Sequence, residues 1–288
     1  MEKSNAIRNK KDKIIIIGII VLTTAFALLL MYPIIYIALG SFKGNKELLL
    51  GGARLFPKKF VFTNYIEAWQ TANFSVYTKN SVFIGVGVMI LTVFTTSMAG
   101  YVFSRKNFKY KELLYSLFVA FMFVNVGSVT LRPLFELAIK LRMNASLWSV
   151  IFIIAGTGQA TFIFLSRGFV NSIPKEIDEA AKIDGCTFFQ TFYKILFPLL
   201  KPITATIALL SFRAGWNEYI LPLVFTMSND SLRPLTVGVN MLKNSGDGAA
   251  AWNIMFAGAT LAILPMILIY LVFSKQFMKG MTAGAVKG

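Results

Sequence analysis

Residues 174–202 read PKEIDEAAKIDGCTFFQTFYKILFPLLKP and form a polar, weakly amphipathic segment between two long apolar runs. Pro174 suits the first turn of a helix, where its missing N–H costs nothing. Glu176 and Asp178 suit a helix N-terminus because they complement its dipole. The Asp-Gly pair at 184–185 is typical of a turn, and an aromatic-rich helix follows it. The stretch therefore predicts a helix, a turn and a second helix between two apolar spans.

The composition indicates a membrane protein. The chain has 288 residues, of which 56% are hydrophobic and 15% are charged, and its mean hydropathy is +0.65. Soluble domains average about 25% charged residues, so this chain is expected to use lipid as its solvent. The net charge of +16 is spread over loops between apolar runs, which favours anionic membrane lipid over nucleic acid as its partner. Because Cys186 is the only cysteine and histidine is absent, we expect no internal disulfide and no metal site.

Uncharged apolar stretches along the chain are long enough to cross a bilayer as helices, which takes about 20 residues each. Transmembrane strands would alternate in segments of about ten residues, and the chain has no such pattern. The first run is too long for a removed signal peptide and lacks a cleavage site. The sequence therefore predicts an all-α integral membrane protein with six transmembrane helices, near residues 14–39, 80–103, 113–131, 145–166, 202–229 and 248–274.

Basic residues decide the predicted orientation, because short cytoplasmic loops carry an excess of Lys and Arg. They are concentrated in the N-terminal tail, the short loop at 104–112 and the C-terminal tail, so both termini are predicted to be cytoplasmic. The longer basic loop after the first span then lies outside. The predicted organisation is a cytoplasmic tail at 1–13, a first transmembrane helix at 14–39, an external loop at 40–79, and a core domain at 80–288 that contains the other five helices and a cytoplasmic loop at 167–201.

By composition alone, the segment at 174–202 is equally compatible with an ordinary connection between two spans. However, the letters EAA at 179–181 and DG at 184–185, followed by Ile195 and Pro198, resemble the EAA loop of permease subunits of bacterial ABC importers. The letters GWNEY at 215–219, with PL at 222–223, resemble the matching segment of the maltose-type carbohydrate permeases. The resemblance implies the type I ABC importer permease fold in a bacterial inner membrane.

The resemblance also implies a function and partners. It implies a subunit of an ATP-driven, binding-protein-dependent importer of a carbohydrate, an oligosaccharide in this branch, that works by alternating access. The implied partners are a second permease in a heterodimer, two ABC ATPase subunits and an extracellular or periplasmic solute-binding protein. The residues expected to couple this chain to the ATPases are Glu179, Ala180, Ala181, Asp184, Gly185, Phe188, Phe189, Ile195 and Pro198.

The chain has no G-x-x-x-x-G-K-[ST] motif, whose backbone would cradle nucleotide phosphates. We therefore expect that the chain is not an enzyme and that it binds no cofactor. ATP and Mg would be bound by the partner ATPases.

The fifth predicted span carries two charged residues, Arg213 and Glu218, and each charge costs about 2.5–3.5 kcal/mol at membrane depth. Such groups usually face protein or water, so this helix is predicted to line the interior of the bundle. A tryptophan ring beside amide and charged groups suits a sugar, because the ring covers the C–H face and polar groups meet the hydroxyls. The candidate substrate-pathway residues are Arg213, Trp216, Asn217 and Glu218. The alternative is that the charges pair with the partner permease and that Trp216 is a packing or gate residue.

Three other readings stay open at this point. An ABC importer permease for a non-sugar solute would share the EAA loop. An ion-coupled secondary transporter would carry carboxylates in several spans and inverted repeats, whereas the five uninterrupted predicted spans contain no acid. A membrane scaffold without transport would leave the two family-like segments unexplained. The glycine pairs Gly85/Gly87 and Gly156/Gly158 lie inside apolar spans and are predicted to allow close helix packing rather than to bind a nucleotide.

Overall fold

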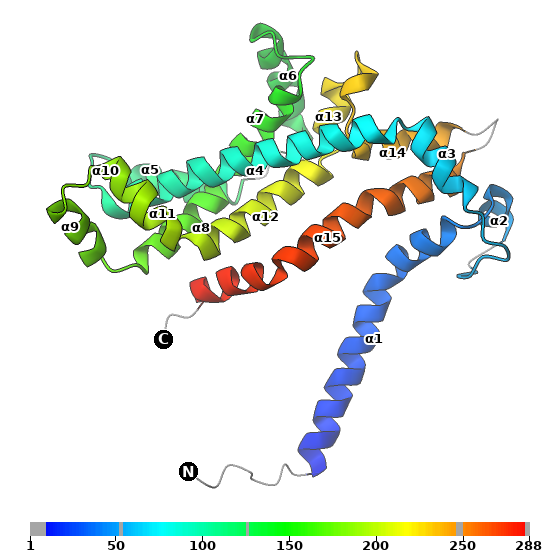
Figure 1. The fold of residues 1–288 in the computed structure, drawn as a ribbon, viewed down its shortest axis with the longest axis horizontal. Helices are drawn as coiled ribbons and strands as arrows, with labels where there is room; N and C mark the ends of the chain where they lie inside the picture. The colour runs from blue at the N-terminus through cyan, green and yellow to red at the C-terminus, as the bar shows by residue number, and fades with distance from the viewer. Residues whose placement is uncertain (1–9, 52–53, 125–126, 246–249, 286–288) are drawn as a thin grey trace. The chain divides into compact units, whose positions relative to one another are not determined.

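The structure, a computed structural model, describes residues 10–51, 54–124, 127–245 and 250–285 (Figure 1). Every regular element in these ranges is a helix, so the predicted all-α class is confirmed. Most of the predicted basic tail at 1–13 lies outside the described residues. The chain divides into two compact units, residues 1–68 with 242–260 and residues 69–241 with 261–288.

Three long helices contain stretches that are apolar enough to cross a membrane without interruption: α1 (Lys10–Gly40), α4 (Phe74–Arg105) and α15 (Trp252–Ala285). In two further places a pair of helices passes the same test but bends at a short break. These pairs are α7 (Leu147–Thr157) with α8 (Gln159–Asn171), bent by 52°, and the run Phe188–Leu199 with α12 (Lys201–Asn217), bent by 82°. Counting each pair as one span, the described residues hold up to five spans.

The predicted span at 113–131 is not one continuous helix. α5 (Lys111–Phe121) covers its first half, and a 3-10 turn, η1 (Gly127–Thr130), leads into α6 (Leu131–Lys140). Gly127 adopts a left-handed φ of 57°, which a right-handed helix does not contain. The uninterrupted apolar composition of this stretch predicted one straight helix. Composition carries no information about a change in the sign of φ, so the break could not be predicted from it.

The predicted span at 202–229 is also interrupted, and here a proline explains the break between α12 and α13 (Ile220–Phe225). Pro222 has no N–H to donate to the carbonyl of Glu218. That carbonyl instead accepts a hydrogen bond from Thr236 Oγ1 at 2.7 Å. Oε1 of Glu218 accepts the first two backbone N–H groups of α13 at 3.1 and 3.2 Å and thereby caps that helix.

Buried polar side chains organise the first unit, which holds α1, α2 (Asn45–Leu50), η4 (Leu242–Ser245), most of α3 (Thr63–Thr71) and the start of α15. Nδ2 of the buried Asn64 donates to two carbonyls just after α1, at 2.7 and 2.9 Å, and Asn253 donates to its Oδ1 at 2.8 Å. Lys43 is also buried and donates to the carbonyl of Arg54. Much of the predicted external loop at 40–79 is therefore ordered structure, and Lys43 is not a free surface charge.

The central helix of the second unit is α4, which lies along α8 and α12 (Figure 1). A Cβ on Gly215 would lie 3.0 Å from Cα of Gly85, and a Cβ on Gly87 would lie 2.7 Å from Ile151. The predicted packing role of the pair at 85 and 87 is thus confirmed. It does not hold for Gly156, where a Cβ would meet nothing within 4 Å. The unit also contains two short elements, η3 (Asp230–Leu232) and α14 (Leu235–Met241).

Two apolar clusters pack against different parts of α4. The first joins Ile84 and Val88 to α7 and to Phe225. The second joins Tyr101, in the last turns of α4, to α8, to the start of α12 and to the segment between those two helices. The second cluster therefore holds the segment after α8 against the Arg105 end of α4.

Candidate coupling loop and solute groove

The segment between α8 and α12 forms two helices, as predicted, and is called the coupling loop here. The first is α9 (Glu176–Ile183), and the second is a continuous run of α10 (Phe188–Gln190), the π-helical η2 (Thr191–Leu196) and α11 (Phe197–Leu199). α9 begins at Glu176 rather than at Pro174. The carbonyl of Lys175 accepts the first helical hydrogen bonds, from the N–H groups of Asp178 and Glu179 at 2.9 and 3.1 Å.

The turn between the two helices is closed by its own backbone. Gly185 has a left-handed φ of 76°, which favours glycine at this position. Its N–H donates to the carbonyl of Lys182 at 3.0 Å, and the N–H of Cys186 donates to the carbonyl of Ala181 at 2.9 Å. These two bonds form a Schellman motif, which satisfies the last carbonyls of α9.

The second helix of the coupling loop begins with a capping box. Thr187 Oγ1 accepts the N–H of Gln190 at 3.3 Å, and Oε1 of Gln190 accepts the N–H of Thr187 at 2.8 Å. The predicted Asp-Gly turn is therefore confirmed. It is built from a helix stop followed immediately by a helix start, which fixes the direction of both helices.

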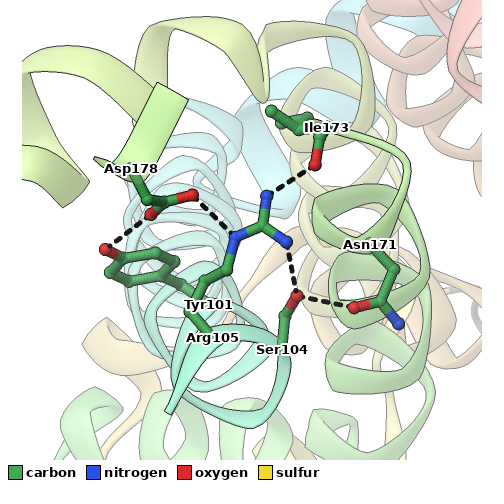
Figure 2. Close-up of polar contacts among 6 residues, drawn as sticks. All are labelled: Tyr101, Ser104, Arg105, Asn171, Ile173 and Asp178. Carbon is green, nitrogen blue, oxygen red and sulfur yellow. Dashed lines mark hydrogen bonds and ion pairs between the residues drawn. The ribbon is translucent and has the colours of Figure 1, made fainter. Parts of the chain in front are cut away.

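Asp178 occupies the inward side of α9 and faces α4 (Figure 2). Its Oδ2 accepts a hydrogen bond from Arg105 Nε at 2.8 Å, and its Oδ1 accepts one from the Tyr101 hydroxyl at 3.1 Å. The two charged side chains are only 7% and 11% exposed. Arg105 also donates through Nη2 to the carbonyl of Ile173 at 2.6 Å. Beside it, Ser104 donates to Asn171 at 2.6 Å, so the end of α4 is tied to the end of α8 as well.

Sequence reasoning gave Asp178 a different role, that of complementing the dipole of its own helix. The residue does lie in the first turn of α9, but its carboxylate is neutralised by an arginine 73 positions earlier in the chain. Removing one member of a buried ion pair leaves the other charge uncompensated, at a cost of about 3–5 kcal/mol. The available signal was the spacing of Asp178 and Ala181, which lie three residues apart and share the buried face of α9.

Aromatic rings attach the second helix of the coupling loop to the same part of α4. The Phe188 ring stacks on the Tyr101 ring with centroids 4.7 Å apart, and the Phe192 ring lies 5.4 Å from it. Nζ of Lys106 lies 4.5 Å from the centroid of Phe188, a cation–π distance. Both helices of the coupling loop therefore contact the last turns of α4.

The outward side of the coupling loop carries charged and apolar side chains. Ile183 is 87% exposed and Phe189 is 62% exposed, although both are large apolar residues. The other predicted coupling residues divide between the two sides. Glu179, Ala180, Asp184, Gly185 and Pro198 are exposed, Phe188 and Ile195 are half-buried, and Ala181 is buried.

Two details of the predicted coupling residues change in consequence. Ala181 packs within its own chain, so it positions α9 and offers no surface for close approach by another protein. Ile183 is absent from the predicted set because it does not belong to the EAA-loop letters on which the resemblance rests. The exposed apolar surface instead comes from the C-terminal end of α9 and the start of the second helix. The coupling role of this set stays a prediction.

The four substrate-pathway candidates of the fifth span differ in their exposure. Trp216 is 3% exposed, and its ring stacks on Phe212 with centroids 5.7 Å apart. This burial favours the packing alternative and leaves no ring face for a sugar. Arg213 and Asn217 are exposed, and Glu218 is half-buried at the break between α12 and α13.

Glu218 opens onto a groove of about 700 Å³ in the second unit. Three helix interruptions of the unit contribute to its wall: the α5–η1–α6 turn, the α7–α8 bend and the α12–α13 break. Interrupted helices at membrane depth are tolerated where the freed backbone lines a cavity, and transporters often bind solutes there. The polar lining side chains are Ser128, Thr130, Thr157, Thr161 and Glu218, and none of the described lining residues is basic.

The family of the chain follows from comparison with known proteins. A family model described as "Binding-protein-dependent transport system inner membrane component" matches residues 6–282. This chain belongs to that family. The permease is 34% identical over 268 residues to the arabinooligosaccharides transport system permease protein AraQ of Bacillus subtilis (strain 168), covering 91% of this chain and 92% of AraQ. It is 34% identical over 236 residues to the melibiose/raffinose/stachyose import permease protein MelC of the same organism, covering 81% and 84%.

A solved structure supports the fold of the permease. The crystal structure of a bacterial ABC transporter involved in the import of the acidic polysaccharide alginate matches with a TM-score of 0.80 at 24% identity, covering 95% of this chain and 100% of that chain. This match confirms the predicted permease fold, and the family model confirms the predicted family. The membrane location follows from the family and from the long apolar helices.

Proposed function

We propose that the permease imports a carbohydrate, with energy from ABC ATPase subunits that bind the coupling loop. AraQ and MelC are named for oligosaccharides, and these names support a sugar as the solute. In this proposal the chain forms a heterodimer with a second permease and receives the solute from an extracellular or periplasmic binding protein. ATP and Mg are bound by the ATPases, and this chain contributes no cofactor and no catalytic residue.

The observation that carries the proposal is the division of the coupling loop into two sides. The inward side is fixed to α4. On the outward side, Ile183 and Phe189 expose apolar surface, and this exposure does not stabilise the isolated chain. Burying such a side chain contributes about 1.5–3 kcal/mol, whereas an exposed ion pair contributes about 0–1 kcal/mol. The apolar pair would therefore supply affinity for an ATPase cleft, and the exposed Glu179 would set the register against a basic group.

The same proposal fixes the orientation and the motion. The coupling loop and both termini lie in the cytoplasm, where the ATPases are, as the basic N-terminal tail and 104–112 loop favour. Closure of the ATPases on ATP carries the docked loop with it. The spans then alternate between inward-facing and outward-facing arrangements, and the solute passes between the two permeases.

The groove at Glu218 is proposed as this chain's share of the solute pathway. Its hydroxyl groups can donate hydrogen bonds to sugar hydroxyls or accept them, its carboxylate can accept them, and its apolar walls can cover sugar C–H faces. A groove whose described lining residues include a carboxylate and no basic side chain repels anions. We therefore propose a neutral carbohydrate as the solute, rather than a uronate or sulfonate.

The function is tested by reconstituting the complete complex in proteoliposomes with its binding protein. ATP hydrolysis is expected to rise only when the binding protein carries its sugar, and sugar uptake is expected to require ATP. The measurement compares neutral oligosaccharides, uronate oligosaccharides and amino acids as loads. Ion-driven uptake by the chain without ATPases would contradict the proposal and favour a secondary transporter, and stimulation by amino acids alone would contradict the carbohydrate assignment.

A Thr161→Val substitution tests the groove, because it removes one hydroxyl while keeping the shape of the side chain. Loss of one hydrogen bond costs about 0.5–1.5 kcal/mol, so the KM for sugar uptake is expected to rise by about two- to twelvefold. The matched control is Thr23→Val, since the Thr23 hydroxyl donates to the carbonyl of Ile19 on α1 and does not line the groove. An unchanged KM in Thr161→Val would remove this groove from the pathway.

A further inference from the structure

We propose that Arg105, Asp178 and Tyr101, here called the latch, transmit movement of the coupling loop to α4. The inference rests on the proposed coupling function and adds positioning residues to it. Asp178 belongs to α9, whereas Arg105 and Tyr101 belong to the last turns of α4 (Figure 2).

The connectivity of the chain creates the need for such a contact. The coupling loop continues directly from α8 and into α12, so those two helices follow its movement through the backbone. α4 is the central helix of the unit, but 73 positions separate Arg105 from Asp178. Movement of the coupling loop can therefore reach α4 indirectly, through α8 and α12 packed along it, or directly, through side-chain contacts between the loop and the last turns of α4.

The geometry of Arg105 suits the transmission of force. Its guanidinium donates on one side to Asp178 in α9 and on another side to the carbonyl of Ile173, which lies just before α9. A planar fork that bonds two points resists rotation as well as separation. Both charged side chains are almost entirely shielded from water, so solvent and salt compete little for the contact.

Tyr101 joins the second helix of the coupling loop to the same point. Its hydroxyl donates to Asp178, while its ring stacks on Phe188 and lies close to Phe192. One side chain of α4 thus contacts both helices of the coupling loop. Displacement of either helix relative to α4 would break a contact with Tyr101.

Two neighbouring residues of α9 point in different directions. Glu179 is exposed on the outward side, where the ATPase is proposed to dock, and Asp178 is buried against α4. Within one helical turn, α9 therefore connects the partner surface to the central span. The latch predicts that docking and transmission can be separated by mutation, because they use different side chains of the same helix.

The test uses the complete complex in proteoliposomes and measures two quantities, the ATPase subunits bound per complex and the sugar molecules imported per ATP hydrolysed. Asp178→Asn is expected to keep the ATPases bound and hydrolysing, while import per ATP falls by about tenfold or more because a buried charge has lost its partner. Tyr101→Phe keeps the ring contacts and removes one hydrogen bond, so the ratio is expected to fall by about two- to tenfold. The matched control is Glu112→Gln. Glu112 forms an ion pair with Arg167, but its own side chain is 71% exposed, so the import ratio of this variant should stay at the wild-type value.

Three outcomes overturn the latch. One is an unchanged import ratio in Asp178→Asn with the ATPases bound. Another is loss of the ATPases from both Asp178→Asn and Tyr101→Phe, which would mean that the contacts only shape the docking surface. If Asp178→Asn does not assemble, an unchanged ratio in Tyr101→Phe overturns the proposal by itself.

An Ile183→Asp variant distinguishes failure of the latch from failure of the proposed function. If Ile183→Asp releases the ATPases while the latch variants behave as wild type, only the latch is wrong. If Ile183→Asp leaves ATPase binding and import intact, the coupling function itself is wrong.

Discussion

An Ile183→Asp variant is expected to lose its ATPase subunits during purification and to import no sugar. Ile183 is 87% exposed at the end of α9, Phe189 is 62% exposed at the start of the second helix, and both are proposed to enter an ATPase cleft. Central apolar anchors of interfaces contribute about 2 kcal/mol or more on truncation, which corresponds to about 30-fold weaker binding. A buried aspartate adds the cost of desolvating a charge. The measurement is the ratio of ATPase to permease after affinity purification, together with sugar uptake.

Leu50→Asp is the matched control for this variant. Leu50 is 85% exposed at the end of the short helix α2, outside the coupling loop, so the two substitutions change equally exposed apolar side chains in the same way. The control should retain the ATPases at the wild-type ratio. Retention of the ATPases by both variants would show that the exposed end of α9 is not the docking surface.

A Gly185→Val variant is expected to reach the membrane but to lose sugar-stimulated ATP hydrolysis. Gly185 holds a φ of 76°, and no atom lies within 4 Å of a Cβ built there, so the effect comes from the backbone rather than from a clash. A β-branched residue in this region costs about 1–3 kcal/mol, which the chain can avoid by opening the Schellman turn. The second helix of the coupling loop would then lose its fixed direction relative to α9.

Gly185→Asn separates backbone strain from every other effect of adding a side chain. Asparagine visits the left-handed region readily, so this variant should keep most of the stimulated hydrolysis. The measurement is ATPase activity with and without sugar-loaded binding protein, with permease abundance in the membrane as the reference. Equal loss in both variants would argue that the position contacts the partner, and equal retention would argue that the turn tolerates other conformations.

Much of the architecture could be predicted from the sequence because lipid imposes a simple rule on composition. Long apolar runs gave α1, α4 and α15, and the Asp-Gly pair at 184–185 gave the turn of the coupling loop. The break at Gly127 was missed because hydropathy does not register a reversal of φ within an apolar stretch. The break between α12 and α13 does have a signal in the sequence, because Pro222 lacks the N–H that a continuous helix needs.

The site was harder to predict because its contacts are long-range. Asp178 read as a helix-dipole residue, since nothing nearby in the sequence indicates that Arg105 approaches it. Trp216 was a candidate for sugar contact with packing as the alternative, since a tryptophan pattern does not distinguish a buried ring from an exposed one, and its burial favours packing. Thr157 and Thr161 were not selected because only the folded chain brings three helix breaks around one groove.

The Schellman motif and the capping box leave the turn of the coupling loop with its backbone groups satisfied before any partner arrives. Association with such a preformed element carries little of the ordering entropy that a disordered segment must lose. The heat-capacity change on association should therefore reflect only the apolar area covered, without the larger contribution of coupled folding. The residence time of the permease on the ATPase would then depend on how well the rigid coupling loop fits the ATPase cleft.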